Sequence, residues 1–258
     1  MRVGFLQFEP RGRDTVFNLR TVARVIEGEE FDLLVLPELC NAGYLLGSRE
    51  TAAAASEPVA GGKTVRGLME LASRFDGYLV AGLIESDGGR IYNSAVLVGP
   101  EGVVHRHRKV HLARHEAAIF DRGDRFDVVE VRGAKVGLAV SFDIWMPEAC
   151  RELARAGAEI LACPAAYGGA WSMDVARVRA IENVVYVVSA NRIGVESSGG
   201  SSVAFRGASQ VIDCDGQVLC QAGKEECAVV VEIDEGRARV KSNVLCDDLG
   251  RELERYRE

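Results

Sequence analysis

Short apolar runs alternate with amphipathic stretches along most of this 258-residue chain, and that alternation limits the folds it can adopt. Apolar runs such as those within 32–36 and 160–163 are typical of strands buried on both faces of a sheet. The segment 15–27 has apolar residues at helical spacing, which predicts a helix that covers such a sheet. Strands that alternate with helices in this way favour an α/β architecture containing parallel strands.

The remaining elements are predicted from the same patterns. We expect further helices at about 62–75, 147–156 and 171–183, the second with proline in its first turn. Further strands are expected at 3–8, 78–84, 91–98, 103–108, 126–131, 136–140 and 185–190, with a β meander within 203–233. The polar tail from Asp234 onward is expected to form a helix and an extended arm.

No stretch rich in Gly, Ser or Pro divides the chain, so we expect one α/β domain over residues 1–258. Its core would span about 1–233 and its C-terminal arm about 234–258. Two sheets with one helical layer outside each, a four-layer αββα sandwich, accommodate this number of strands. The patterns alone do not give the strand order.

Composition and charge argue against several classes of partner. Hydrophobic residues make up 48% of the chain, enough for a large core, and the net charge of −7 argues against nucleic acid. No apolar run approaches the roughly 18 residues that cross a bilayer, and the first residues do not resemble a signal peptide. We therefore expect a cytoplasmic protein that does not bind a membrane.

Cysteine usage agrees with that expectation. An odd number of cysteines at irregular spacing favours reduced thiols over a disulfide framework. The chain has no CxxC or HExxH pair, so it is expected to need no metal and no cofactor. The seven cysteines stand at positions 40, 150, 163, 214, 220, 227 and 246.

Three expected strand ends carry residues suited to catalysis. Glu38 follows the first of them, where open α/β sheets bind ligands and where burial raises a carboxyl pKa. Lys109 follows the second, and its ammonium group can stabilise an oxyanion. Ser141 follows the third, on a turn before a helix, where a nucleophile is exposed near backbone N–H groups. Taken singly, each has a plainer interpretation, as a surface carboxylate, a solvated basic edge strand and an ordinary strand end.

A serine esterase is an alternative from a different class, with Ser141 activated by a histidine such as His111. The segment around Ser141 is not a GxSxG elbow, and the four histidines all lie between positions 105 and 115. No acid–histidine–serine order is apparent, so we rank this alternative low. It predicts that the chain as given is active and loses activity on Ser141→Ala and on His111→Ala.

Together these segments resemble the signatures of the nitrilase superfamily, whose members hydrolyse carbon–nitrogen bonds. The resemblance runs from the first strand to about residue 233, and several ordered motifs are more specific than any one alone. The three main segments are Pro37–Tyr44, Arg108–Leu112 and Val136–Asp143. Supporting matches are Glu116, Phe120, Gly123-Asp124, Pro147–Ala149, Gly157–Leu161, Arg179-Ala180, Glu182-Asn183 and Asn191-Arg192.

The resemblance implies an αββα fold that pairs across helices into a homodimer with an eight-layer core, or assembles into a higher homo-oligomer. It implies hydrolysis of a non-peptide C–N bond in a small amide or nitrile by a Glu–Lys–Cys triad, through a thioester. The triad falls on Glu38, Lys109 and position 141, and the backbone N–H of Phe142 would help to hold the oxyanion. Glu116 resembles a second carboxylate that positions the substrate or the lysine.

Position 141 departs from the family pattern, because serine stands where the family has cysteine. A thiol has a pKa near ~8.5 and gives up its proton to a carboxylate far more readily than a serine hydroxyl does. We therefore expect this chain to bind substrates but turn them over very slowly. Either an engineered exchange that traps complexes or a naturally non-catalytic, small-amide-binding relative explains the serine, and we favour the first. Cys40 and Cys163 lie near the expected site, but their contexts favour structural roles.

The expected substrate pocket is compact and mostly apolar. Ile144-Trp145-Met146 follows the nucleophile position, without an arginine that would clamp a carboxylate, so we expect small neutral amides or aliphatic nitriles rather than dicarboxylic monoamides. The residues expected to wall the pocket are Tyr44, Phe142, Trp145, Met146, Ala165, Ala166, Tyr167 and Trp171.

Overall fold

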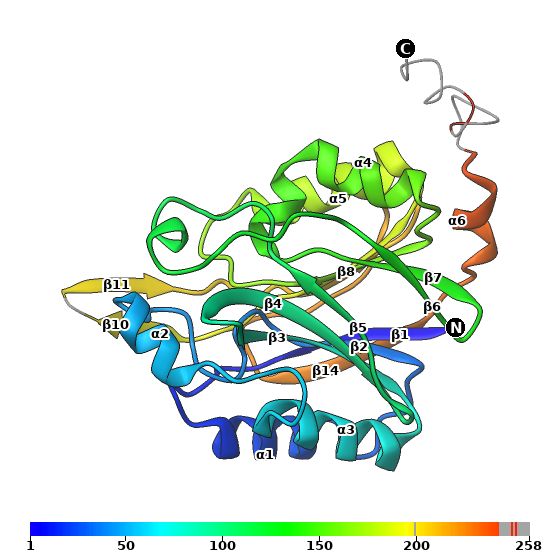
Figure 1. Cartoon of the computed structure of the whole chain (residues 1–258). Helices are drawn as coiled ribbons and strands as arrows, with labels where there is room; N and C mark the ends of the chain where they lie inside the picture. Colours follow the sequence, from blue (N-terminus) through cyan, green and yellow to red (C-terminus); the bar gives the residue numbers. More distant parts are fainter. Residues whose placement is uncertain (199, 243–248, 250, 252–258) are drawn as a thin grey trace.

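Two β-sheets pack face to face, and helices cover the outer face of each, as Figure 1 shows. The structure is a computed structural model that describes residues 1–198, 200–242, 249 and 251. Within that part of the chain each of the two main sheets has six strands. The fold is therefore the single-domain αββα sandwich that the sequence predicts.

The first sheet has mixed direction. Its central strands β1, β2 and β3 are parallel, and antiparallel strands flank them on both sides. Because β3, β4 and β5 alternate in direction, β5 ends at the same edge as β2. In spatial order the strands are β14 (Cys227–Glu232), β1 (Arg2–Gln7), β2 (Leu33–Val35), β3 (Tyr78–Asp87), β4 (Arg90–Gly99) and β5 (Gly102–Arg108).

The second sheet repeats this plan. Its central strands β7, β8 and β9 are parallel, with antiparallel strands at its edges. A short hairpin, β10 (Val195–Ser198) with β11 (Ser201–Ala204), extends beyond it. In spatial order the strands are β13 (Val218–Gln221), β12 (Gln210–Ile212), β9 (Tyr186–Ala190), β8 (Ile160–Pro164), β7 (Ala134–Leu138) and β6 (Val128–Val131).

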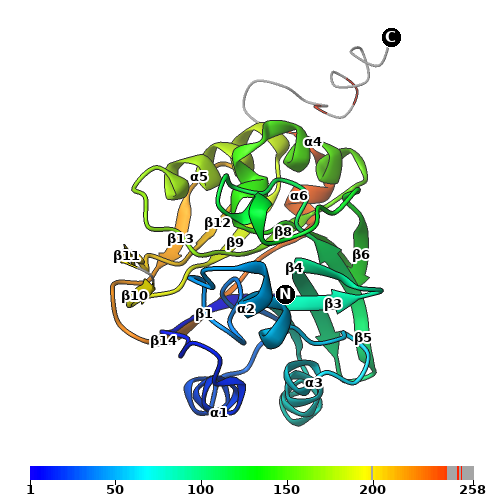
Figure 2. The same ribbon diagram turned by 60° about the vertical axis from the view of Figure 1, so that its left-hand side comes forward.

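Helices α1 (Thr15–Val25) and α3 (Lys63–Phe75) lie side by side over the first sheet, and α4 (Pro147–Arg155) and α5 (Ser172–Asn183) over the second, as Figure 2 shows. Two shorter helices, α2 (Arg49–Ala55) and α6 (Gly236–Val240), lie at the ends of the sandwich. No helix in the described residues is long and apolar enough to span a membrane.

Strand alternation explains the layers. In β2, Leu33 and Val35 face the other sheet, whereas Leu34 packs towards α1 and α3. In β8, Ile160 and Ala162 join the same central core. Successive side chains of a strand point to opposite faces, so strands that are apolar at every position need cover on both sides.

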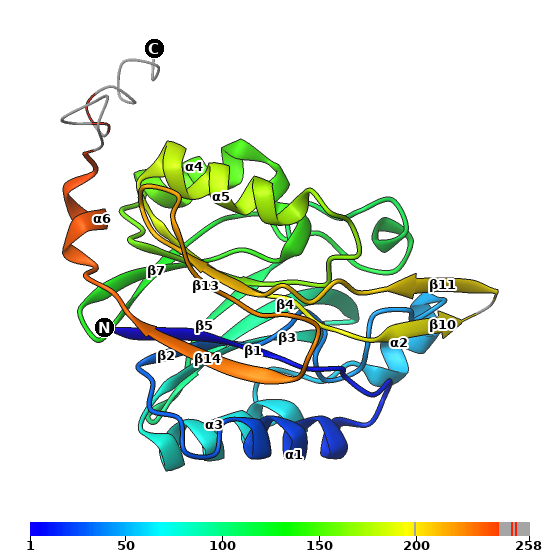
Figure 3. The same cartoon turned by 180° about the vertical axis from the view of Figure 1, so that it is seen from behind.

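The structure differs from the sequence prediction in three segments. Strand β14 pairs with β1 in the first sheet, so 203–233 is not a single meander (Figure 3). Helix α2 was not predicted, because its run of alanines lacks an apolar stripe, although Ser48 caps its N-terminus through Thr51. The β10–β11 hairpin was also missed, because its residues are mostly exposed and polar. Of the predicted C-terminal arm, α6 is helical, and most of the remainder lies outside the described residues.

Candidate active site

A buried ion cluster lies where β2 and β5 end. Lys109 Nζ donates to Glu38 Oε1 at 2.7 Å and to Glu116 Oε1 at 2.6 Å. Asn93, on β4, donates through Nδ2 to the same two oxygens at 2.7 and 3.1 Å. Glu116 Oε2 accepts the backbone N–H of Ala113 at 2.7 Å. All three charged side chains are buried, so their charges are compensated mainly by one another.

The backbone fixes Glu38 between the two sheets. Its N–H donates to the carbonyl of Ala165, which follows β8 of the opposite sheet, at 3.2 Å. On the other side, Gly82 of β3 lies so close that a Cβ there would stand 2.5 Å from the Glu38 Cα. Glycine at position 82 therefore allows the chain to approach the strand closely as it leaves β2.

Burial and charge set the protonation of this cluster. Desolvation raises the pKa of Glu38, with Glu116 adding to the rise while Lys109 and Asn93 oppose it. Burial alone would lower the pKa of Lys109, but the two carboxylates outweigh it and hold that pKa above its usual value. Glu38 Oε2 has no hydrogen-bond partner among the described residues. The cluster thus combines a fixed cation with a carboxylate whose second oxygen is free to accept a proton.

Ser141 stands on a strained turn at the end of β7. Its φ of 46° is left-handed, an uncommon conformation for a residue other than glycine. A short 3₁₀ segment, η2 (Ser141–Trp145), continues into α4 at Pro147. The side chain is largely buried, with 6% of the residue exposed.

Asp143 connects this turn to the segment that carries Lys109. Its carboxylate accepts the N–H of Val140 at 3.0 Å on one side, and the N–H groups of Val110 and His111 at 3.2 and 2.8 Å on the other. The imidazoles of His107 and His111 bond to it at 3.0 and 3.1 Å. Burial would raise the pKa of Asp143, but these hydrogen bonds hold it below its usual range. One anion therefore joins the two sheets at the site.

Tyr167 and Arg179 hold the carbonyl groups of the turn. The Tyr167 hydroxyl donates to the Ser141 carbonyl at 3.0 Å and contacts the Cys163 thiol at 3.5 Å. Arg179, on α5, donates to the carbonyls of Ile144 and Trp145 at 2.7 and 3.2 Å. The backbone around Ser141 is thus bonded to side chains from two further segments.

The histidines do not form the arrangement that a serine esterase needs. His107 and His111 both bond to Asp143 and stack on Phe126, whereas His115 bonds to the Tyr44 hydroxyl at 2.9 Å. Within the described residues, no histidine bonds to the Ser141 hydroxyl, so the esterase alternative gains no support from the geometry.

The expected pocket residues have different surroundings. Phe142 and Trp145 lie near each other, with ring centroids 6.3 Å apart, and both are half-buried beside the turn. Ala165 and Ala166 are buried after β8, Ala165 completely. Tyr44 is half-buried and borders a cavity near Glu116. Trp171 is 70% exposed at the start of α5 and lines none of the described cavities.

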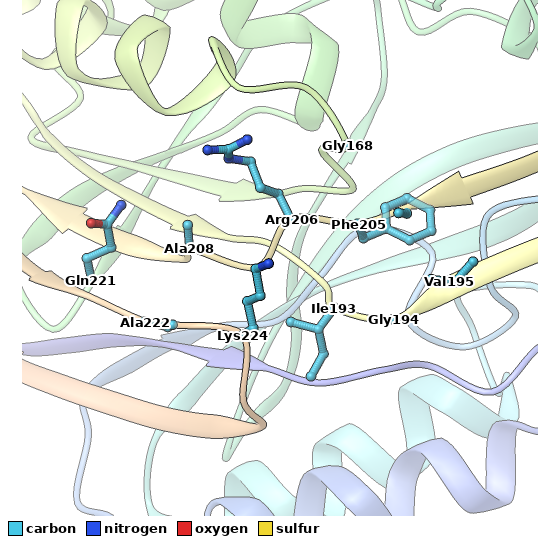
Figure 4. A pocket seen from close by; sticks show the side chains of 12 residues that line it. Gly168, Ile193, Gly194, Val195, Phe205, Arg206, Ala208, Gln221, Ala222 and Lys224 are labelled. Atoms are coloured by element: carbon cyan, nitrogen blue, oxygen red, sulfur yellow. The ribbon is translucent and has the colours of Figure 1, made fainter.

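A separate cavity of about 750 Å³ lies between the β10–β11 hairpin and the turn that follows β13. Figure 4 shows Arg206 and Lys224 extending from neighbouring segments of its wall. None of Glu38, Lys109 and Ser141 lines it. The largest of the described cavities is therefore distinct from the ion cluster.

Sequence reasoning missed Asn93 and gave Asp143 no role. Asn93 and Ser94 form a polar pair inside an otherwise apolar strand, and that pair was the available signal for a buried polar network. In the described part of the chain, no group of three or more His, Cys, Asp or Glu side chains is arranged to hold a metal ion.

An αββα sandwich here carries a buried acid–lysine cluster, and a residue on a strained turn is joined to it through Asp143. Comparison with known proteins identifies its family. The carbon–nitrogen hydrolase family model matches residues 2–241, and the chain belongs to that family.

Individual relatives agree with this assignment. The chain is 37% identical over 240 residues to an (R)-stereoselective amidase of a Pseudomonas species, covering 91% of this chain and 85% of the relative. It is 35% identical over 239 residues to a nitrilase of Pyrococcus abyssi, covering 91% and 90%. Among solved structures, a cysteine-to-serine mutant of the Nesterenkonia AN1 amidase from the nitrilase superfamily has a TM-score of 0.76 at 28% identity, covering 92% of this chain and 93% of that one.

Proposed function

We propose that this chain binds a small uncharged amide or nitrile at Glu38, Lys109 and Ser141, and that serine at position 141 makes hydrolysis very slow. The observation that carries the proposal is the buried Glu38–Lys109–Glu116 cluster, which lies at the strand ends where the Ser141 turn is joined to the Lys109 segment through Asp143. Family membership supports the same bond class.

With cysteine at position 141, the reaction on an amide follows from the cluster. The free oxygen of Glu38 accepts the thiol proton, and the sulfur forms a bond to the amide carbon. The Lys109 ammonium and the Phe142 N–H stabilise the oxyanion. Glu38 returns the proton to the departing nitrogen as the C–N bond breaks. Water, deprotonated by Glu38, then attacks the thioester carbon and the C–S bond breaks, which releases the carboxylic acid. Glu38 returns the proton to the departing thiolate, and this restores both groups.

With serine, the first step is the obstacle. The hydroxyl is far less acidic than a thiol, and a serine nucleophile ordinarily relies on an aligned histidine base. The raised pKa of Glu38 makes it a better base than an exposed carboxylate, but it remains much weaker than an alkoxide. Binding is not affected in the same way, because the two side chains differ by one atom and the rest of the cluster is unchanged.

The direct test compares ammonia release by this chain and by its Ser141→Cys variant on a panel of small amides and nitriles. We expect the cysteine variant to be faster by at least about 10²-fold, with Ser141→Ala at background. The Nesterenkonia mutant indicates that a cysteine-to-serine exchange is compatible with this fold. If Ser141→Cys folds, binds amides and still releases no ammonia, the non-catalytic amide-binding alternative is correct and the proposed hydrolysis is wrong.

For the substrate, we propose neutral amides and aliphatic nitriles rather than dicarboxylic monoamides. Ile144, Trp145 and Met146 follow the nucleophile turn, and none of them can pair with a second carboxylate. Preferred turnover of a dicarboxylic monoamide over propionamide by the Ser141→Cys variant would contradict this preference.

We further propose that the chain forms a homodimer through α5. Val178 and Ile181 are 49% and 42% exposed, and their spacing of three residues places them on one face of this helix. Exposed apolar side chains that share one face of a helix are typical of a protein interface. Light scattering should give twice the chain mass, and Ile181→Asp should yield monomer, whereas the same change at exposed Val103 should leave the dimer intact. A monomer at micromolar concentration without any substitution would overturn this proposal.

We also propose a cytoplasmic location. The described cysteines are free thiols, and several of them are buried, which fits a reducing compartment. Thiol titration of protein isolated with a rapid alkylating quench should find all seven cysteines reduced. Recovery of disulfide-bonded protein would contradict it.

A further inference from the structure

A cavity of about 580 Å³ lies beside the ion cluster. Its walls come from the loop after Glu38, the 3₁₀ segment η1 (Glu116–Ala118) and the β10–β11 hairpin. The volume lies in the range of small-molecule sites. The side chains that matter to the argument are those of Tyr44, Leu46, His115, Ala118, Ile119 and Ser201.

Two of the cavity walls also carry the cluster. One begins at Tyr44, six residues after Glu38, and the other contains Glu116 next to His115. Tyr44 and His115 meet between them, with a hydroxyl-to-Nε2 hydrogen bond of 2.9 Å and ring centroids 5.4 Å apart. Burial raises the pKa of the Tyr44 hydroxyl, and the charges of Glu38 and Glu116 add to the rise. Tyr44 therefore stands between the cavity and the cluster.

The walls suit an uncharged apolar group. Leu46, Ile119 and the Tyr44 ring provide apolar surface in a half-enclosed space. The arginine in the lining, Arg49, is already occupied, since it donates to Asp121 at 2.6 Å and to the Ile119 carbonyl at 2.8 Å. Glu50, at the rim, would repel a carboxylate. A substrate anion would thus meet a guanidinium that is already paired and the negative charge of Glu50.

We propose that this cavity is a subsite for a bulky, uncharged apolar substituent of the amide substrate, with the Tyr44–His115 pair forming its boundary with the ion cluster. This inference rests on the proposed amide-binding function and extends it, because the substrate class then includes neutral amides with aryl or branched groups. The segments that carry Glu38 and Glu116 then also contact the apolar substituent of the substrate. The same loops would therefore position the catalytic carboxylates and determine which substituents bind.

Binding to the chain as it stands, with Ser141, provides the test, because it does not require turnover. Ligand-observed NMR titration would compare propionamide, 4-phenylbutyramide and glutaramic acid. We expect the phenyl amide to bind about tenfold or more tightly than propionamide, since burial of a phenyl group is worth at least that factor, and the acid to bind most weakly.

Two substitutions fill the cavity from two different walls, and each has a neighbour as its control. Ala118→Trp and Ser201→Trp should bring the two amides to within about threefold of each other. Ala117→Trp and Ser202→Trp should keep the tenfold preference, because these exposed neighbours do not line the cavity. Because the filling residues come from different elements, misfolding of one variant, visible by circular dichroism, leaves the other to decide.

Equal affinity for the two amides, or a preference that survives both filling substitutions, would overturn the subsite. Ammonia release from propionamide by Ser141→Cys, measured in parallel, reports on the hydrolytic function alone. A failed subsite therefore shows as equal affinity of the unsubstituted chain for the two amides, or as a preference that both filling substitutions leave unchanged, with hydrolysis intact. A failed hydrolytic function shows as no ammonia release, whatever the binding preference.

Discussion

The two sheets hold their parts of the site by different interactions. The first sheet supplies Glu38, Lys109 and Asn93, which are held by charge and by one another within a buried cluster. The second sheet supplies Ser141, whose turn is fixed through backbone groups that bond to Asp143 and Tyr167. Substitutions on the first side should therefore act mainly on charge, and those on the second mainly on the geometry of the turn. All activities below refer to the Ser141→Cys background.

Loss of the cluster cation should have the largest effect. Lys109→Met leaves two buried carboxylates without their partner, so we expect stability to fall by about 3–5 kcal/mol. Activity should fall by at least about 10²–10³-fold, since the principal group facing the oxyanion is removed. Urea denaturation and ammonia release measure the two effects.

The matched control is Lys63→Met, at an exposed lysine on α3, which should change neither quantity appreciably. A Lys109→Met protein with normal stability would contradict the view that charge holds this side of the site.

Asp143→Asn should have the next largest effect, because it removes the anion that joins the two sheets while keeping the side-chain shape. An amide cannot accept every bond that the carboxylate accepts from backbone and imidazole groups. We expect a loss of about 2–3 kcal/mol in stability and of roughly tenfold or more in kcat. Retention of full stability in urea would show that the turn does not need this anion.

The same residue gives a pH dependence. The pKa of Asp143 is lower in the folded state than in the unfolded chain, so its contribution to stability is fully present above the unfolded value of about 3.9. That contribution is lost as the pH falls below this value towards the folded pKa. The chain should therefore lose stability more steeply below about pH 4 than Asp143→Asn does, in urea titrations at a series of pH values. If the stability of the two proteins changed with pH in the same way, the lowered pKa would not belong to Asp143.

Tyr167→Phe should have a smaller effect and one confined to geometry. It removes one hydrogen bond to the Ser141 carbonyl, worth about 1 kcal/mol, without changing any charge. We expect kcat to fall by about threefold to tenfold with little change in KM. Without this hydrogen bond the nucleophile at position 141 is held less precisely, whereas the side chains that contact the substrate are unchanged. Tyr78→Phe, which removes an exposed bond to Glu101, should leave kcat unchanged. A change in KM alone would indicate that Tyr167 acts on substrate binding instead.

The same contrast explains how far sequence reasoning reached. The apolar strands and amphipathic helices were predictable because their periodicity follows burial, as β2 and α3 illustrate. Glu38 was identified because it follows a buried strand and Lys109 because it follows a predicted strand, and the structure joins them through an ion pair. The links made by Asn93 and Asp143 cross between strands far apart in sequence, and no local pattern records them. Strand β14 was misassigned for the same reason, since pairing with β1 is a long-range choice.

The two cysteines near the site should give the smallest effect of all. Cys40 and Cys163 are buried, and burial raises the pKa of each thiol to about 12, so both remain protonated at neutral pH and are poor nucleophiles. Cys40→Ala with Cys163→Ala should therefore keep ammonia release within about threefold. The small loss expected at position 163 reflects its contact with Tyr167, whereas the Tyr167 hydrogen bond to the Ser141 carbonyl stays in place. Loss of all activity in the double variant would instead assign the nucleophile to one of these thiols and overturn the role given to position 141.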